Sequence, residues 1–187
     1  MSTDAFNDMI LNEQARLAAK DKFIKTELKK NCTDAEVNME NKYGDFRIAR
    51  AMFEGSVDSK KTIEENIKDL IMEKNLRISR AKSHAIAMGK SDKEIAAIIE
   101  GIELEYSDKI TNLRFNQSVA DTTSVLKQKT LNEAETSYIG SRFNNIFATS
   151  EYVSNLMSLA SDYLNLGKMQ QNYNFTQSQK DRLDYMG

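Results

Sequence analysis

The sequence predicts an all-α protein made of a few long amphipathic helices, and three observations support this prediction. The 187 residues include no proline, where average usage would give about nine. They include only seven glycines. Proline breaks helices, and glycine supplies the positive φ of tight turns, so a chain short of both has few turns and long segments. Apolar residues also recur three and four positions apart, which is the spacing of a helix with one buried face.

The composition indicates a thin core. Charged residues make up 29% and hydrophobic residues 40%, a balance typical of helices whose exposed faces outnumber their buried ones. The net charge of −2 argues against a dedicated nucleic-acid binder, although a local patch could still touch DNA. The first residues lack the basic and apolar regions of a signal peptide, so we expect synthesis in the cytoplasm.

Residues 1–56 are predicted to form an N-terminal helical segment. Its first helix has apolar positions at Phe6, Ile10, Leu17, Ile24 and Leu28. Thr33 and Glu36 have the spacing of a capping box, which predicts a break or kink near residues 31–33. The next apolar stretch is expected to end at residues 54–56.

Residues 57–140 are predicted to form a long helical hairpin. Gly89 stands where the first arm must stop, and Ser91 and Glu94 can form the capping box that starts the second arm. We therefore expect a turn centred on Gly89–Lys90, with the two arms antiparallel in an extended bundle. In the second arm, polar residues replace aliphatic ones from Asn116 to Lys129, which would favour a particular register or oligomer, or line a wet lumen.

The C-terminal part is predicted to have two segments. A break at Gly140–Ser141 should precede an amphipathic helix over residues 141–167, ended by Gly167. Residues 168–187 are rich in Gln, Asn and Tyr, which predicts a flexible polar tail.

The apolar positions of the second arm and the last helix are the candidate surface for an oligomer or partner. We predict contacts there from Ile95, Ile99, Ile102, Tyr106, Ile110, Leu113, Gln117, Phe143, Phe147, Leu156 and Tyr163.

No group of residues points to catalysis. Gly89-Lys90-Ser91 resembles the end of a phosphate-binding loop, but the required first glycine is replaced by His84. His84 is the only histidine and Cys32 the only cysteine, which is too few for a zinc or di-metal site and gives a catalytic dyad no support. We expect His84 to be an ordinary packed or boundary residue. The sequence thus predicts no enzyme, metal, cofactor or small-molecule substrate.

Two kinds of charged cluster have ordinary explanations. Glu100, Glu103, Glu105 and Asp108 lie amid lysines, as on a solvated helix face. Basic clusters, around Lys25 and around Arg77, could touch phosphate but are interspersed with acids, so solvation or subunit salt bridges are favoured.

The run Arg77–Gly89, the capped Ser91 and the long polar helix that follows resemble the small internal core (ejection) proteins of short-tailed bacteriophages. A junction of similar type follows at Ser141-Arg142-Phe143-Asn144. The resemblance covers about residues 60–167. The hairpin here is flanked by more charge, and the final segment has less glycine and alanine, than is usual in that family.

The resemblance implies a structural virion protein, stored in the phage interior and oligomeric in a ring near other core or portal proteins. It would leave the head before the DNA and then help the DNA across the host envelope, in transient contact with DNA or membrane. Two alternatives come from the residues themselves. One is a helical, chaperone-like protein-binding module, and the other is a membrane-active protein acting through residues 143–166.

Overall fold

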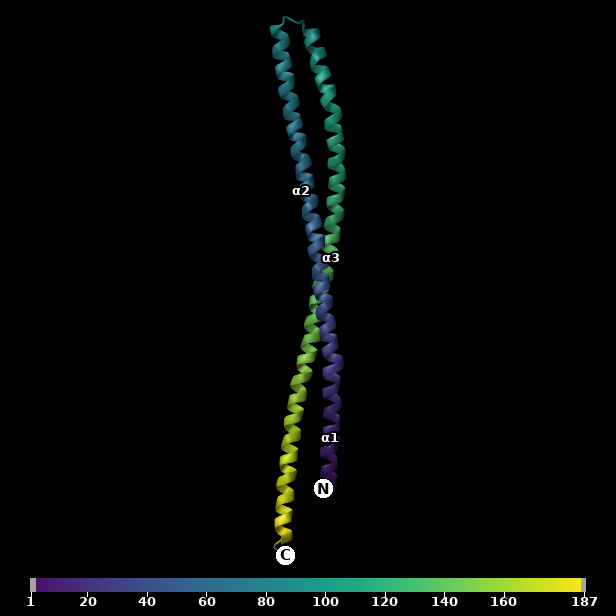
Figure 1. Ribbon diagram of the computed structural model, residues 1–187, viewed down its shortest axis with the longest axis vertical. Coiled ribbons are helices and arrows are strands. Elements are labelled where there is room, and N and C mark those ends of the chain that lie inside the picture. The colour runs from purple at the N-terminus through teal and green to yellow at the C-terminus, as the bar shows by residue number, and fades with distance from the viewer. Residues whose placement is uncertain (1–2, 186–187) are drawn as a thin grey trace. The chain divides into compact units, whose positions relative to one another are not determined.

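The computed structural model describes residues 3–185, and every described residue is helical except Met88–Ser91. The elements are the α-helix α1 (Thr3–Phe23), the π-helix η1 (Ile24–Leu28), α2 (Lys29–Ala87) and α3 (Asp92–Tyr185) (Figure 1). The chain divides into two compact units, Met1–Tyr43 with Ser137–Gly187 (unit 1) and Gly44–Thr136 (unit 2). The all-α fold with a helical hairpin is confirmed.

The predicted turn ends α2 in unit 2, and its hydrogen bonds define a Schellman motif. The Gly89 N–H donates to the carbonyl of Ile86 at 3.0 Å, and the Lys90 N–H donates to that of Ala85 at 3.1 Å. Gly89 has φ +68°, which a residue with a side chain rarely adopts. On the other side, the Ser91 N–H donates to Glu94 Oε2 at 2.9 Å, so the predicted capping box is also confirmed.

The two arms of unit 2 are antiparallel. Arg77 contacts Glu105, Glu73 contacts Tyr106, and Lys60 contacts Asp121, so residue numbers fall on α3 as they rise toward the turn on α2. The buried residues are small or aliphatic apart from one aromatic ring, and they form a single seam between the helices: Ala49, Ile67, Ala85, Ile95, Ile102 and Tyr106.

Unit 1 is also a pair of antiparallel helices, with its own core. Phe6 stacks on Tyr173 with ring centroids 5.8 Å apart, and Tyr43 meets Tyr138 at 5.2 Å. Between these aromatic pairs lies a cluster of buried aliphatic residues: Ile10, Leu17, Ile24, Leu28, Leu159 and Leu166. The N-terminal apolar positions predicted from spacing therefore form one face of this core.

Unit 1 also has a seam, which is the line of buried and half-buried residues where α3 faces α1 and the start of α2. The π-helix η1 accommodates one extra residue on the α1–α2 side of this seam. Buried or half-buried positions on α3 alternate in steps of three and four, as at Ala148, Tyr152, Asn155, Leu159, Asp162 and Leu166. On the facing helix the steps become four, four and four at Lys20, Ile24, Leu28 and Cys32. The Lys29 N–H accordingly donates to the carbonyl of Ile24, five residues back, which keeps both flanking stretches facing α3.

The breaks predicted at residues 31–33, 54–56 and 140–141 are wrong, because α2 and α3 continue through all three. The Thr33 hydroxyl donates to the carbonyl of Lys29 at 3.1 Å, four residues back, as it does inside a helix. Ser141 likewise donates to the carbonyl of Tyr138 at 2.7 Å. A capping pattern therefore did not end a helix where buried and half-buried positions continued at helical spacing.

The predicted stop at Gly167 and the flexible tail are also wrong within the described residues. α3 runs to Tyr185, and Met169 and Tyr173, both beyond Gly167, pack against the unit 1 core. Residues 186–187 of the predicted tail lie outside the described residues. The two units do not coincide with the four segments expected from the sequence.

Candidate interaction surfaces

The predicted interface residues of the second arm lie in the seam of unit 2. Ile95, Ile102 and Tyr106 are buried there, and Tyr106 is only 1% exposed. The remaining four, Ile99, Ile110, Leu113 and Gln117, are half-buried in the same seam. These side chains therefore pack within the chain, which leaves them little area for a partner while the hairpin is closed.

The polar stretch of the second arm also faces α2. Gln117 Nε2 lies 3.5 Å from Glu64 Oε1, and Lys60 Nζ lies 2.8 Å from Asp121 Oδ1. The ion pair raises the pKa of Lys60, chiefly through its hydrogen bond to Asp121. Because such polar pairs stabilise less than buried aliphatic contacts, they fix the register of the two arms more than they stabilise them.

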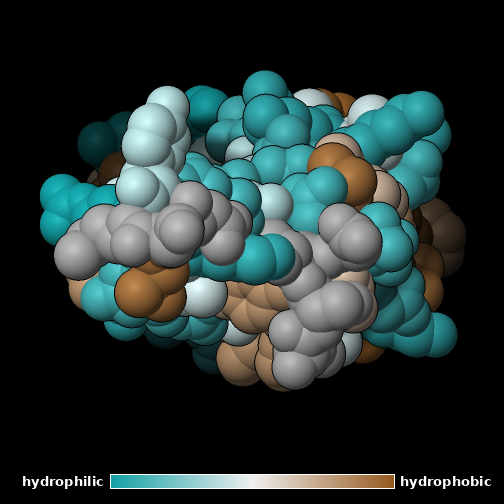
Figure 2. Space-filling model, turned by 90° about the horizontal axis from the view of Figure 1, so that it is seen from below, coloured by the Kyte–Doolittle hydropathy of each residue, from teal (hydrophilic) through white to brown (hydrophobic). Residues whose placement is uncertain are grey.

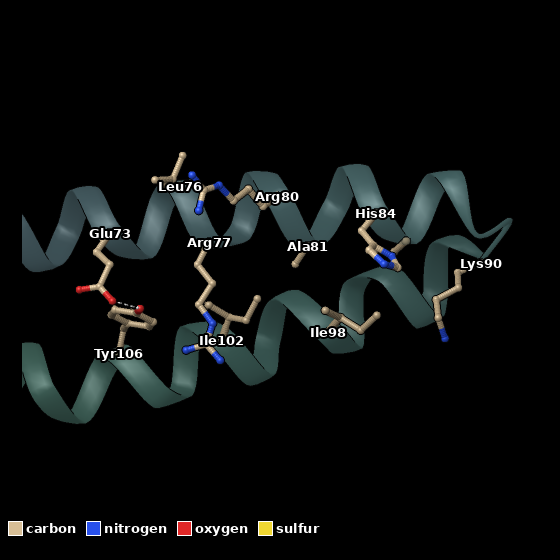
Figure 3. Close-up of a pocket in the computed structure, with 11 residues that line it drawn as sticks. Glu73, Leu76, Arg77, Arg80, Ala81, His84, Lys90, Ile98, Ile102 and Tyr106 are labelled. Carbon is tan, nitrogen blue, oxygen red and sulfur yellow. Dashed lines mark hydrogen bonds between the residues drawn. The ribbon is translucent and has the colours of Figure 1, made fainter.

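A groove of about 640 Å³ lies between the arms near the turn (Figure 3). Its floor is apolar, from Ala81, Ala85, Ile98 and Ile102, and its rim carries Arg77, Arg80, His84 and Lys90. Figure 3 shows Arg77 and His84 reaching from α2 toward α3, while Leu76 points away. His84, expected to be packed or at a boundary, is an exposed residue on this rim.

The charged residues beside this groove are engaged with one another. The Tyr106 hydroxyl donates to Glu73 Oε1 at 2.8 Å, and Arg77 donates to Glu105 at 2.8 Å. Arg77 also lies over the Tyr106 ring, 5.7 Å from its centroid. The hydrogen bond from Arg77, helped by Lys109, lowers the pKa of Glu105. This arrangement holds the two helices together and contains no activated nucleophile.

The ion pairs of unit 1 flank its core. Lys20 Nζ lies 2.7 Å from Asp162 Oδ2 and joins α1 to α3, and Arg16 contacts the same carboxylate at 3.5 Å. The hydrogen bond from Lys20 is the main reason that the pKa of Asp162 is lowered. Arg16 also contacts Glu13 one turn earlier, and that hydrogen bond lowers the pKa of Glu13.

The last four predicted interface residues divide between two faces of α3. Leu156 packs against the unit 1 core, whereas Phe143, Phe147 and Tyr163 are exposed. Phe143 and Phe147 belong to a second apolar stripe. Residues of this stripe recur every three or four positions, as the buried residues of α3 in unit 1 do. The stripe lies roughly 150° around α3 from those buried residues.

We call this stripe the outer face of α3. Its large side chains are between 45% and 70% exposed, and they are Ile139, Phe143, Ile146, Phe147, Val153, Met157 and Leu164. The positions between them are small: Gly140, Ser150, Ser154, Ala160 and Ser161. No charged residue occurs on this face from Ile139 to Gly167. Its counterpart on α2 in the same unit carries Lys30, Asp34 and Glu40.

Exposed hydrophobic residues are a general feature of the chain. Seen from below, hydrophobic residues lie on the surface beside hydrophilic ones (Figure 2). The described part of the chain exposes 28 large hydrophobic side chains, whereas its core has 12 buried hydrophobic residues, two of which are alanines. Single exposed hydrophobic residues need no explanation, whereas a continuous uncharged stripe is a candidate interaction surface.

The sequence prediction found only part of this face. It assigned Phe143 and Phe147 to an interface but did not separate the apolar residues of the last segment into two stripes. The separating signal is present, because Tyr152, Leu159 and Leu166 share one heptad phase and Ile139, Ile146 and Val153 share another. A helix with a single apolar seam would carry only the first set.

Other kinds of site have little support among residues 3–185. No group of three or more His, Cys, Asp and Glu side chains could hold a metal ion there. Within the same range, no helix is long and apolar enough to span a membrane. Cys32 belongs to unit 1, where its Sγ lies 3.4 Å from Thr149 Oγ1, and His84 belongs to unit 2.

Comparison with protein-family models gives no match for this chain, and comparison with curated protein sequences gives none at the threshold of significance.

Proposed function

We propose that this chain is a non-enzymatic structural protein that assembles with copies of itself. The observation that supports this most is the outer face of α3, which is apolar, uncharged and exposed. Depletion of charge at the centre of a surface patch is the compositional mark of a protein–protein interface. Elsewhere on the described helices, charged side chains are frequent and engage in pairs such as Arg50 with Glu54.

The amount of exposed surface also supports assembly. Within each unit the buried residues form one seam between two antiparallel helices, and 28 large hydrophobic side chains of the described part of the chain stay exposed. Each unit consists of two helices, so every helix buries one seam and leaves the rest of its surface open. Packing further helices against that surface would supply the core that a two-helix unit lacks.

A more specific role follows from the resemblance to phage internal core proteins. In that role the oligomer is a component of the virion interior, next to other core or portal proteins, and takes part in delivering DNA across the host envelope. The support for it is the sequence pattern of residues 60–167 together with the long hairpin. Assembly into an oligomer is common to this role and to the general proposal.

A binding module for another protein is the second candidate. The groove near the turn favours it, because an apolar floor beneath a basic rim fits an amphipathic helix with acidic flanks. A module of this kind needs no self-association.

Light scattering on the full-length chain over a concentration series tests the proposal. We expect a defined mass of two or more subunits that persists on dilution into the micromolar range. A mass of 21.3 kDa at every concentration, which is that of one chain, would contradict self-assembly and favour the binding module.

A further inference from the structure

We infer that the outer face of α3 between Ile139 and Leu164 binds the same face of a second copy, with the two α3 helices antiparallel. The inference rests on the self-association proposed above and names the surface and the orientation. A symmetric pair of this kind is closed, because the same patch serves both subunits.

The area of the outer face matches what a dimer needs. Its seven large side chains are 45–70% exposed, which corresponds to roughly 700 Å² of apolar surface per subunit. A standard stable interface buries about 800 Å² on each partner. The stripe spans 26 residues, or roughly 39 Å of helix, so one helix of the partner can cover it along its length.

The sizes of the side chains favour the antiparallel orientation. The half of the stripe before residue 152 has four large residues and two small ones, with Phe143, Ile146 and Phe147 close together, while the half after it has three of each. With a two-fold axis near residue 152, Phe143 would meet Ala160 and Ser161, and Leu164 would meet Gly140. In the parallel orientation Phe143 and Phe147 would each meet their own copies, while Gly140 and Ser161 would leave gaps. Facing large with small residues fills the interface without gaps or overcrowding.

The centre of the stripe suits a close approach of two helices. Ser150 and Ser154 lie on either side of the axis position, and antiparallel packing places each opposite the other. Their short side chains let the helix axes come together, and Phe147 then meets Met157, a favourable contact between an aromatic ring and a thioether. Neither orientation brings like charges together, because the face has none.

Single cysteines test the pairing in the full-length chain, with Cys32→Ser removing the native thiol. Disulfides form only when the two Cα atoms lie within about 7 Å. Val153→Cys lies next to the axis and should yield a covalent dimer on mild oxidation. Ile139→Cys alone should not, because its own copy lies roughly 39 Å away. A mixture of the Ile139→Cys and Leu164→Cys proteins should yield the dimer again.

The outcomes separate this inference from the proposed function. A dimer from Ile139→Cys alone would overturn the antiparallel orientation. An oligomeric mass with no disulfide from Val153→Cys would overturn the surface while self-association stands, and a monomer would overturn both. If a fluorophore on Val153→Cys responds only to phosphatidylglycerol vesicles, the face binds membrane and the inference fails.

A second measurement does not depend on disulfide geometry. Phe143→Glu combined with Met157→Glu should at least halve the mass measured by light scattering, because two charges would be buried in the interface. Val37→Glu, on the exposed side of α2 in the same unit, should leave the mass unchanged. Equal masses for both variants would overturn the inference.

Discussion

At the level of single residues, a few side chains hold the seam of unit 2 together. Tyr106 is the largest fully buried residue, and it does three things at once. Its ring fills the seam of unit 2, its hydroxyl donates to Glu73, and Arg77 and Lys109 lie over its ring at 5.7 and 5.0 Å. The spacing of apolar residues placed Tyr106 in a seam but gave no sign of its partner on α2.

Replacing Tyr106 with alanine should therefore destabilise unit 2 by about 3 kcal/mol, in the range known for buried aromatic residues. The loss should appear as a lower midpoint of urea unfolding followed by circular dichroism. Met72→Ala is the matched control, because Met72 is 65% exposed on α2 nearby, and its effect should stay within about 0.5 kcal/mol. Equal losses for the two variants would show that the ring is not buried as described.

The stability of unit 1 should fall in acid. The pKa of Asp162 is lowered in the folded chain by its hydrogen bond from Lys20, so the folded state binds the proton less readily than the unfolded state does. The resulting stabilisation is present above the unfolded pKa, near 3.8, and is lost as the pH falls through the lower folded value. The pKa of Glu13, also in unit 1, is lowered too and adds to this trend. The lowered pKa values of Glu94 and Glu105 predict the same direction for unit 2.

Melting temperature measured against pH checks this expectation. It should be nearly flat from neutral pH to about pH 5 and should fall below about pH 4. The melting temperature of the Asp162→Asn variant should be lower at neutral pH and should fall less on acidification, because this variant has already lost the ion pair with Lys20. Salt at about 0.5 M should reduce the difference between the two proteins. A variant whose pH profile runs parallel to that of the wild type would contradict the role of Asp162.

At the level of helices, the spacing of buried positions along a whole helix outweighs local capping patterns and glycines in deciding where the helix ends. Capping patterns and glycines predicted breaks at residues 31–33, 54–56 and 140–141, yet buried and half-buried positions keep their spacing of three and four through each, and the helix continues. Among residues 3–185, a positive φ and a loss of helical spacing occur together only at Gly89. The hairpin was therefore predictable, while the length of α2 and α3 was not, since single-site signals cannot show whether a facing helix supports the backbone.

The π-helix is an element that local signals did not reveal. It is visible only when seam positions on both helices are compared, because the three successive steps of four define the extra residue. Deleting Thr26, an exposed residue inside η1, should restore the alternation of three and four and let an ordinary α-helix form.

The melting temperature of the Thr26 deletion should therefore equal or exceed that of the wild type. Deleting Asn38, an exposed residue of α2 in unit 1, should lower it by about 5 °C or more, because residues on one side rotate out of the seam. Thermal unfolding followed by circular dichroism distinguishes the two. If both deletions lower the melting temperature equally, η1 does not serve to keep the register.

At the scale of the whole molecule, the fold class followed from composition, but the candidate interface followed only in part. The absence of proline and the recurring apolar spacing suffice for an all-α hairpin, as found. The predicted interface mixed residues of the seam, such as Ile102 and Tyr106, with exposed ones such as Phe143. Apolar residues on one helix look alike in sequence, and which of them are covered depends on where the partner helix lies.

We propose that the two-helix units are completed by association with another copy. Because association stabilises only the folded state, the melting temperature of such a protein rises with its concentration. Thermal unfolding of the wild-type chain between about 1 and 200 µM tests this directly. We predict a steady rise in melting temperature over that range, and a much smaller rise for the Phe143→Glu, Met157→Glu variant. A wild-type melting temperature that stays constant across the range would contradict the claim.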